Sequence, residues 1–236
     1  MTEEVADNTR EIRNSIEAFS FAALLECASR EDYIRLTHFG ALHDVVQQIS
    51  DDLIAFSNKD PASKFDPHLI LRTYTSFPAV LHYRLAHWID TQFCSGAANL
   101  FDPSLPAFLS KRGKMISGAK IHFKSKIGKR FILDHGFGTV IGETTTIGDD
   151  CYCLGGVVLG ARGISGNTLE PRHPIIGNRV QIGSFASVFG RVKIGDDVFI
   201  GPNCMISEDI PSGANIRIKS SIQITYPQRT KVVVNA

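Results

Sequence analysis

The second half of the chain repeats an apolar position every six residues. This position is occupied by Ile176, Ile182, Val188, Ile194, Ile200 and Ile206. The fifth place of each hexad is also apolar and mostly small, and it holds Val180, Ala186, Val192, Val198, Cys204 and then Ile210. A period of six fits neither an α-helix nor an isolated strand, so the pattern predicts repeated coils. Each coil is expected to combine short flat strands with tight corners.

The same pattern begins earlier in the chain and is interrupted twice. Its earlier inward positions are Ile121, Ile127, Leu133, Ile141, Ile147, Cys153 and Leu159. The step from Leu133 to Ile141 is eight residues instead of six, which places residues 134–138 out of register. After Leu159 the pattern resumes only at Ile176, so residues 160–175 form an excursion rich in Gly, Asn, Arg and Pro. Because loops on a regular scaffold often carry function, these two interruptions are the predicted sites of chemistry.

Residues before about 115 follow a helical pattern instead. Over residues 41–57 the apolar residues recur on one helix face, and this helix should end before Pro61. A second helix is predicted to begin at Pro78, and residues 102–106 are predicted to form a break before the strands. The expected fold is α+β, with a helical assembly domain at 1–115, a repeat domain at 116–215 and a C-terminal tail at 216–236.

Composition and charge narrow the expected partners and compartment. The 236 residues are 43% hydrophobic, and the formal net charge of +1 comes without a run of Lys or Arg, so no nucleic acid partner is expected. No segment has the pattern of a signal peptide or the length of a membrane span, so a cytoplasmic protein is expected. The five cysteines lack metal-ligand spacing, and Cys151, Cys153 and Cys204 occupy inward positions. No metal site is therefore expected.

Three short motifs accompany the hexads. Asp134-His135 lies in the eight-residue step, residues 138–144 follow it, and Arg172-His173 closes the long excursion. Residues 60–62 and 83–88 add matches in the helical part. Together these motifs resemble the serine O-acetyltransferase family of hexapeptide-repeat acyltransferases over roughly residues 58–210, with this chain as a divergent member. The resemblance implies that the coils wind as a left-handed parallel β-helix.

The resemblance also implies a reaction. A hydroxyl group must lose its proton as it attacks a thioester, and an imidazole that titrates near neutral pH can accept that proton. In the family this base corresponds to His135, and Glu143 is a nearby carboxylate that is a second catalytic candidate. The expected acceptor is the hydroxyl of L-serine, giving O-acetyl-L-serine, or of a close hydroxy-amino acid.

The remaining site residues are assigned by the same resemblance. Arg172 and His173 are expected to hold the amino acid, and Asp60 and Asp134 match positions that contact it. For acetyl-CoA, the acyl donor, the implied contacts are Gly160, Ala161, Gly183, Ala186 and Gly201. In trimeric members the site lies between neighbouring prisms, so a homotrimer, or a hexamer made of two trimers, is expected.

Two departures from the family affect these expectations. The aspartate that orients the imidazole in the family is replaced by Lys120, which cannot accept a hydrogen bond from an imidazole N–H. The C-terminal isoleucine that docks into cysteine synthase in the family is also absent, because the sequence ends Val234-Asn235-Ala236. A complex with cysteine synthase is therefore not expected.

Three other functions remain open on the sequence alone. The acceptor could be homoserine or a sugar on the same fold. A γ-type carbonic anhydrase shares the repeats, but its three zinc-binding histidines need a spacing that His122, His135 and His173 lack. A non-catalytic assembly protein could keep the repeats, which Lys120 favours and the Arg172-His173 pair disfavours.

Overall fold

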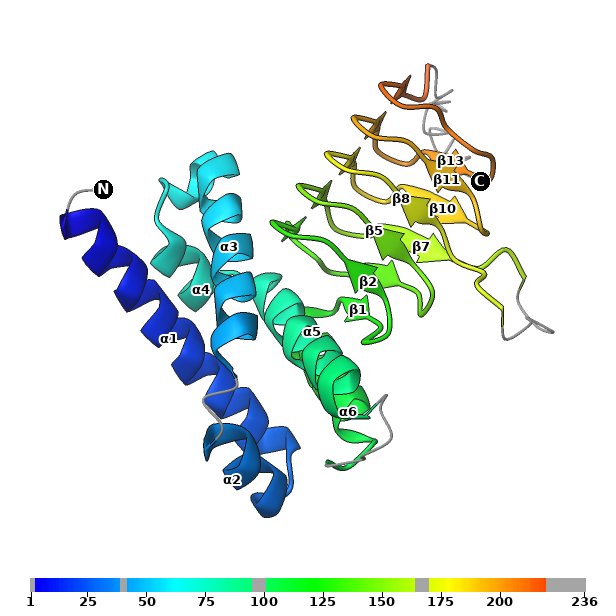
Figure 1. Cartoon of the computed structure of the whole chain (residues 1–236). Helices are drawn as coiled ribbons and strands as arrows, with labels where there is room; N and C mark the ends of the chain where they lie inside the picture. The colour runs from blue at the N-terminus through cyan, green and yellow to red at the C-terminus, as the bar shows by residue number, and fades with distance from the viewer. Residues whose placement is uncertain (1–2, 39–41, 95–100, 164–169, 220–236) are drawn as a thin grey trace, which may run out of the picture.

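The computed structural model describes residues 3–38, 42–94, 101–163 and 170–219, and it places a layer of helices beside one end of a stack of coils (Figure 1). The helices are α1 (Glu3–Cys27), α2 (Arg30–His38), α3 (His43–Lys59), α4 (Pro67–Thr73), α5 (Phe77–Ile89) and α6 (Leu105–Ser117), with a 3-10 turn η1 (Pro61–Ser63) and a π-helical turn η2 (Asp90–Cys94). The C-terminal residues on which the expectation about cysteine synthase depends lie outside the described residues.

The strands of the described residues form three parallel sheets. Sheet A contains β1 (Lys120–Ile121), β4 (Val140–Ile141), β7 (Val158–Gly160), β10 (Ser187–Phe189) and β13 (Met205–Ile206). Sheet B contains β2 (Lys126–Ile127), β5 (Thr146–Ile147), β8 (Ile175–Ile176) and β11 (Lys193–Ile194). Sheet C contains β3 (Ile132–Leu133), β6 (Tyr152–Cys153), β9 (Gln181–Ile182), β12 (Phe199–Ile200) and β14 (Asn215–Ile216).

The chain visits the three sheets in the repeating order A, B, C, so each coil is one triangular layer of a prism. Equivalent positions stack directly, as when Ile121 pairs with Ile141 and Ile141 with Leu159. Three vertices result, which we name A–B, B–C and C–A after the sheets that they join. The parallel sheets agree with the predicted repeat domain.

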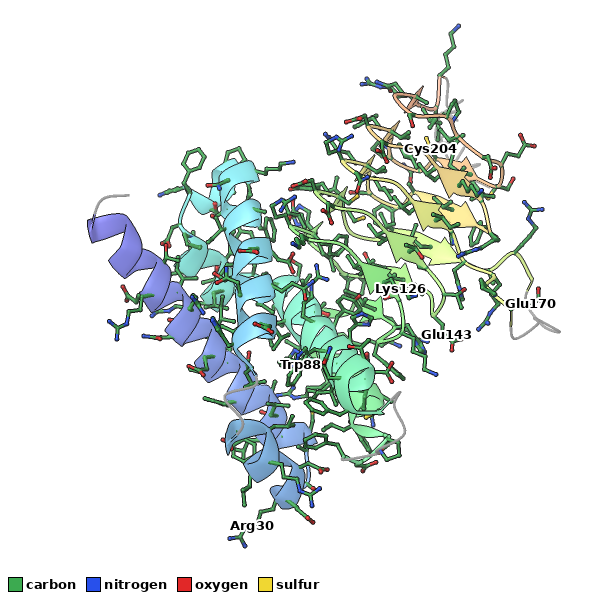
Figure 2. All side chains as sticks on the ribbon, in the orientation of Figure 1. Arg30, Trp88, Lys126, Glu143, Glu170 and Cys204 are labelled. Carbon is green, nitrogen blue, oxygen red and sulfur yellow. The ribbon has the colours of Figure 1, made fainter. Side chains whose placement is uncertain are left out.

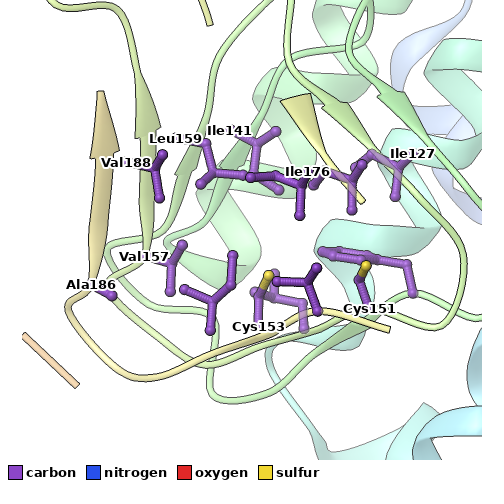
Figure 3. Packing of buried hydrophobic residues seen from close by; sticks show 14 of the residues in the cluster. Ile127, Ile141, Cys151, Cys153, Val157, Leu159, Ile176, Ala186 and Val188 are labelled. Atoms are coloured by element: carbon purple, nitrogen blue, oxygen red, sulfur yellow. The ribbon is translucent and has the colours of Figure 1, made fainter. Parts of the chain in front are cut away.

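The predicted inward positions form the core of this prism (Figure 3). The hexad aliphatics from Ile121 to Ile206 are each at most 7% exposed, and the small fifth residues from Cys151 to Cys204 are at most 5% exposed. Cys151 and Cys153 are among them, which confirms their interpretation as core residues. Burial raises the pKa of the Cys151 thiol to about 11, so it stays protonated.

The B–C vertex shows how the sequence forms such tight corners. At three successive levels a glycine is followed by Asp or Asn, and the side-chain oxygen of that residue accepts a backbone N–H of the coil below. Asp149 Oδ1 accepts from Lys129 at 2.8 Å, Asn178 Oδ1 from Asp149 at 2.9 Å, and Asp196 Oδ1 from Asn178 at 2.8 Å. These bonds satisfy backbone groups that a sheet edge would leave unpaired.

Both helices predicted from the sequence are present, as α3 and α5. The predicted break at 102–106 is present only over residues 102–104, and it does not lead directly to the strands. A further helix, α6, begins at Leu105 and continues to Ser117 before the strands start. Pro106 occupies its first turn, where a missing N–H costs nothing, so this proline marks a helix start. Gly118, with φ of 73°, then ends α6 in the left-handed conformation.

One buried ion pair joins the helical layer to the prism. Arg84 on α5 and Asp52 on α3 are 1% and 0% exposed, and Arg84 Nε lies 2.8 Å from Asp52 Oδ2. The same guanidinium donates to the carbonyl oxygens of Ile127 and Gly128 at 2.6 and 2.5 Å. Asp52 Oδ1 in turn accepts the N–H of Phe131 at 2.9 Å. The pair thus fixes both helices on the first coil.

Replacing Arg84 should therefore destabilise the whole fold. Arg84→Met leaves the Asp52 carboxylate buried without a counter-ion, and we expect the free energy of unfolding in urea to fall by about 3–5 kcal/mol. The matched control is Arg130→Met, which removes a bidentate but solvent-exposed pair with Asp150. That variant should lose at most about 1 kcal/mol. Equal losses in the two variants would contradict the anchoring role.

Candidate active site

The first interruption of the hexads forms an outward turn at the C–A vertex. Residues 134–138 connect β3 in sheet C to β4 in sheet A, and His135, Gly136 and Gly138 have φ of 61°, 66° and 78°. The His135 side chain is 78% exposed. Gly136 packs against the helical layer, since an added Cβ would lie 3.0 Å from Ser76 Cβ at the start of α5. The two extra residues thus carry the imidazole out of the core, as predicted.

Two carboxylates and two phenols gather beside this turn. Asp134 Oδ2 accepts the Tyr152 hydroxyl at 2.9 Å. Asp60, at the end of α3, accepts the Tyr74 hydroxyl on Oδ2 at 2.5 Å and the Ala62 N–H on Oδ1 at 2.9 Å. The bond to Asp60 raises the pKa of Tyr74 to about 12, and the negative charge of Asp134 adds to that rise. Burial, followed by the bond to Asp134, raises the pKa of Tyr152, which also feels the charge of Asp60. Both phenols therefore remain hydrogen-bond donors.

A second group of candidates lies at the A–B vertex. Arg172 Nη2 donates to Glu143 Oε2 at 2.9 Å, and both side chains are about one-third exposed. This hydrogen bond is the largest cause that holds the pKa of Glu143 below its usual value, so the carboxyl is ionised at neutral pH. Figure 2 shows Glu143 on the same side of the prism as Glu170. The structure thus pairs Glu143 with Arg172.

His173 is buried at the same vertex and held in one tautomer. Its Nδ1 accepts the N–H of Thr144 at 3.2 Å and lies 2.8 Å from the Thr144 hydroxyl. The Thr144 hydroxyl oxygen also accepts the backbone N–H groups of Arg172 and His173, at 2.9 and 3.1 Å. Burial lowers the pKa of His173, and the charge of Arg172 lowers it further. The ring is therefore neutral at neutral pH and carries its proton on Nε2.

His122 and Lys120 complete the surroundings of this vertex. His122 Nδ1 accepts the N–H of Lys124 at 3.2 Å, and its pKa is lowered mainly by burial. The charges of Lys120 and Lys124 lower that pKa further, while Glu143 opposes them. Among the residues that the structure describes, no three His, Cys, Asp or Glu side chains are placed to hold a metal ion.

The candidate residues thus fall into two groups at different vertices of one chain. Asp60, Asp134 and His135 lie at the C–A vertex, whereas Glu143, Arg172 and His173 lie at the A–B vertex. The hydrogen bonds described above join Asp60 and Asp134 to phenols near the C–A vertex, and Arg172 to Glu143 at the A–B vertex.

The candidate acetyl-CoA contacts divide in the same way. Gly183 and Gly201 follow β9 and β12 at the C–A vertex, on the coils above His135, and Gly183 donates its N–H to Ile200 O at 2.7 Å. Gly160 and Ala161 lie at the end of β7, on the approach to the A–B vertex. Ala186 is 0% exposed and its side chain belongs to the core, so only its backbone shapes the vertex.

Two surface grooves accompany these small residues. A groove of about 410 Å³ runs along the outer face of sheet C beside the C–A vertex, and it is lined by Lys59, Tyr152, Leu154, Gln181, Ile182, Gly183, Phe199 and Pro202. A second groove of about 640 Å³ lies beside sheet A and includes Ala161, Arg162, Phe189 and Met205. The first groove includes Tyr152, the partner of Asp134, and its lining residues other than Lys59 lie on or just after three successive strands of sheet C.

Comparisons with known proteins identify the family to which these features belong. The family Bacterial transferase hexapeptide (six repeats) matches residues 173–208. A serine acetyltransferase of Helicobacter pylori is 40% identical over 156 residues, which cover 66% of this chain and 84% of that relative. The chain belongs to the serine acetyltransferase family. A serine acetyltransferase of Staphylococcus aureus is 35% identical over 172 residues, covering 73% of this chain and 75% of the relative.

Solved serine acetyltransferases share the fold. Isoform 3 from Entamoeba histolytica, solved in complex with cysteine, superposes with a TM-score of 0.68 at 32% identity and covers 95% of this chain and 75% of that one. The soybean enzyme complexed with serine gives a TM-score of 0.70 at 28% identity, with 86% and 80% coverage. Membership of this family makes the chain an acyltransferase. Among the residues described, no helix is both long and apolar enough to cross a membrane.

Several residues that contact the candidate site residues give no signal in the sequence. Tyr152 occupies an outward position of a predicted strand, so the sequence indicates where its side chain lies but not which residue it contacts. Tyr74 and Thr144 belong to no motif that indicates chemistry, and their contacts depend on folding. Tyr83, by contrast, lies in a matched motif and donates to Ser125 O at 2.8 Å, so that motif serves to join α5 to the prism.

Gly142 should be indispensable for the placement of His173. An added Cβ would lie 2.0 Å from His173 Cδ2 and 2.2 Å from its Nε2, so Gly142→Ala must displace the ring. A displacement near 1 Å in a site can cost about 100-fold in rate, and we expect kcat/KM for acetyl transfer to fall by about that factor. An unchanged melting temperature would show that the prism is intact. Wild-type kcat/KM would contradict a role for His173.

Proposed function

We propose that this protein transfers the acetyl group of acetyl-CoA to the hydroxyl of L-serine, giving O-acetyl-L-serine and coenzyme A. Family membership supports the reaction, and the cluster at the C–A vertex is the observation that carries it. There the exposed imidazole of His135 lies 3.9 Å from Asp134, and the charge of Asp134 also reaches Tyr74, the phenol that holds Asp60. A base beside an ammonium-binding pocket is what an amino-acid hydroxyl requires.

In the proposed reaction His135 accepts the hydroxyl proton through Nε2. The serine oxygen forms a bond to the thioester carbonyl carbon, and the carbon–sulfur bond breaks as the tetrahedral intermediate collapses. The proton then passes from Nε2 to the departing sulfur, so coenzyme A leaves as a thiol and the imidazole returns to its neutral form. The proposal uses no metal ion at any step.

The two vertex groups match the two charges of a free amino acid. Asp60 and Asp134 would bind its ammonium group, because two carboxylates close together favour a cationic ligand. Arg172 would bind its carboxylate through its planar fork, with Glu143 holding the guanidinium in place. His173 presents Nε2–H as a further donor. Homoserine would place its hydroxyl one methylene farther from His135, and a sugar lacks both charges.

Because those groups lie at different vertices, we propose that the site is completed by a neighbouring prism. Sheet A joins the two vertices, and its outward residues Val140, Val158 and Ser187 are only partly exposed in one chain. Such a flat and partly apolar face suits a contact between prisms. We propose a homotrimer of left-handed coils, as in the hexapeptide-repeat acyltransferases, with the helical domain (residues 1–115) joining two trimers into a hexamer.

The acetyl-CoA arm would follow the C–A vertex upward from His135. Strands of neighbouring coils are about 4.8 Å apart, so the three steps from β3 through β6 and β9 to β12 span about 14 Å. Gly183 and Gly201 lie along this path, and the groove on sheet C opens beside it. Gly160 and Ala161 would face the same arm from the adjacent prism. Small residues at these points let the backbone approach the arm closely.

Removing the base should abolish acetyl transfer without unfolding the protein. His135→Ala is expected to lower kcat by about 100-fold to 10,000-fold with serine, measured as coenzyme A release. The matched control is His68→Ala, which removes a histidine at the start of α4 outside both vertex groups. It should keep wild-type kcat. A His135→Ala enzyme with wild-type turnover would contradict the proposed base, and faster turnover of homoserine or a sugar than of serine would contradict the acceptor.

Subunit mixing tests whether the site is shared. His135→Ala and His173→Ala are each expected to be inactive, but they damage different vertices. If equal amounts are unfolded together and refolded, random trimers should regain about a quarter of wild-type activity, because one site in four then pairs two intact vertices. Refolding each variant alone is the control. No regained activity in the mixture would show that one chain forms the whole site.

A further inference from the structure

The base of the proposed reaction lacks the partner that its family provides. The position of the orienting aspartate is Lys120, which lies in β1 and donates its backbone N–H to Thr139 O at 2.8 Å. An imidazole that is 78% exposed would otherwise sample several rotamers and both tautomers. A general base works only when the lone pair of one nitrogen is aimed at the acceptor proton. The structure should therefore contain another group that orients His135.

Asp134 is placed to be that group. Its side chain is 15% exposed, and its Oδ1 lies 3.9 Å from His135 Nδ1. Its other oxygen, Oδ2, is held by the Tyr152 hydroxyl at 2.9 Å. Tyr152 belongs to β6, which pairs with β3, the strand that leads into the turn. The position of the phenol is therefore fixed by sheet C. One carboxylate oxygen is thus immobilised and the other is presented to the imidazole.

We infer that Asp134, held by Tyr152, positions His135 for catalysis in place of the missing family aspartate. Asp134 Oδ1 accepts the proton of His135 Nδ1–H, which leaves the Nε2 lone pair free for the serine hydroxyl. A rotation of the exposed ring closes the 3.9 Å separation to hydrogen-bond length. The inference rests on the proposed function and assigns Asp134 and Tyr152 as positioning residues of the same site.

This role does not conflict with binding of the ammonium group. An ionised carboxylate offers about four lone-pair directions, and Tyr152 and His135 use one each. The imidazolium that forms when His135 takes the hydroxyl proton carries its charge beside Asp134, which stabilises it. The proton leaves Nε2 for the coenzyme A sulfur, and the Nδ1 proton stays on the ring throughout. Asp134 therefore changes neither its charge nor its proton during the reaction.

Asp60 is also held by a tyrosine hydroxyl, but its role differs from that of Asp134. Its Oδ2 accepts the Tyr74 hydroxyl, and its Oδ1 accepts the N–H of Ala62 in η1. Both oxygens are therefore directed by the helical layer, and the ion pairs of the described residues link His135 to Asp134 and not to Asp60. Tyr74 thus serves the ammonium pocket only. Phenylalanine substitutions at the two tyrosines form a matched pair. Each substitution removes the hydroxyl group that holds one of the two carboxylates.

Kinetics of the two phenylalanine variants test this division. Tyr152→Phe frees Asp134, which serves both the base and the ammonium pocket, and should lower kcat about 10-fold while also raising KM for serine. Tyr74→Phe frees Asp60 and should raise KM for serine about 10-fold with kcat nearly unchanged. Both variants should keep the wild-type melting temperature to within a few degrees, because each loses one partly exposed hydroxyl. Equal changes in kcat and KM for both variants would overturn the inference.

The tautomer of His135 gives a second readout that a structural defect would not reproduce. Solid-state NMR of the whole protein with isotope-labelled histidine, compared with His135→Ala to identify the signal, should show a protonated Nδ1 in the wild type. In Asp134→Ala and Tyr152→Phe the Nε2–H form should increase, and in Tyr74→Phe it should not. A wild-type ring protonated on Nε2 would overturn the inference. If instead His135→Ala keeps full activity, the proposed base itself is wrong.

Discussion

The buried contact between Arg84 and Asp52 determines where the candidate site can form. Taking a guanidinium and a carboxylate out of water is tolerated only when nearly every polar atom is paired, so the geometry is strict. Here the donors and acceptors come from α3, α5 and the first coil, which leaves these three elements one relative arrangement. Asp60 follows the end of α3 and Ser76 precedes α5. Both therefore reach the C–A vertex at fixed positions. Asp60 is there a candidate residue for substrate binding, and Ser76 packs against Gly136.

The hexad register imposes the second constraint. A coil whose inward residues stack on those below has no room for an added residue, because a shift of one would turn apolar side chains outward. The two additional residues between Leu133 and Ile141 must therefore leave the prism at a vertex. They do so through a turn with three left-handed residues, which carries His135 into solvent. The longer excursion leaves at the A–B vertex and returns through Arg172 and His173.

These constraints explain what the sequence could predict. The prism, its core residues and its two interruptions follow from spacing, because every coil repeats the same local geometry. The break predicted at 102–106 covers only residues 102–104, because Pro106 lies in the first turn of α6 and proline is compatible with both a break and a helix start. Likewise, Asp52 gave no signal, since an acidic residue in a helix is usually solvated and its burial depends on Arg84.

The candidate site was predictable only in part for a related reason. Motifs named the residues with unusual chemistry, namely His135, Arg172 and His173, but not the residues that hold them. Tyr74, Tyr152 and Thr144 act through single hydroxyl groups whose partners come from distant parts of the chain, 14 to 29 residues away. Residues 164–169, in the longer of the two interruptions, lie outside the described residues.

The separation of charge between the two vertices has a physical consequence for the proposed site. If Arg172 shared a vertex with Asp60 and Asp134, it would form ion pairs with them, and a zwitterionic ligand would have to break those pairs before binding. Instead Glu143 holds the guanidinium, while neutral phenols hold the two aspartates. Phenols direct a carboxylate without cancelling its charge, so the negative vertex keeps its attraction for an ammonium group. On the proposed assembly, the two vertices then meet across a subunit contact, where the ammonium group of the amino acid supplies the counter-charge that the two aspartates lack.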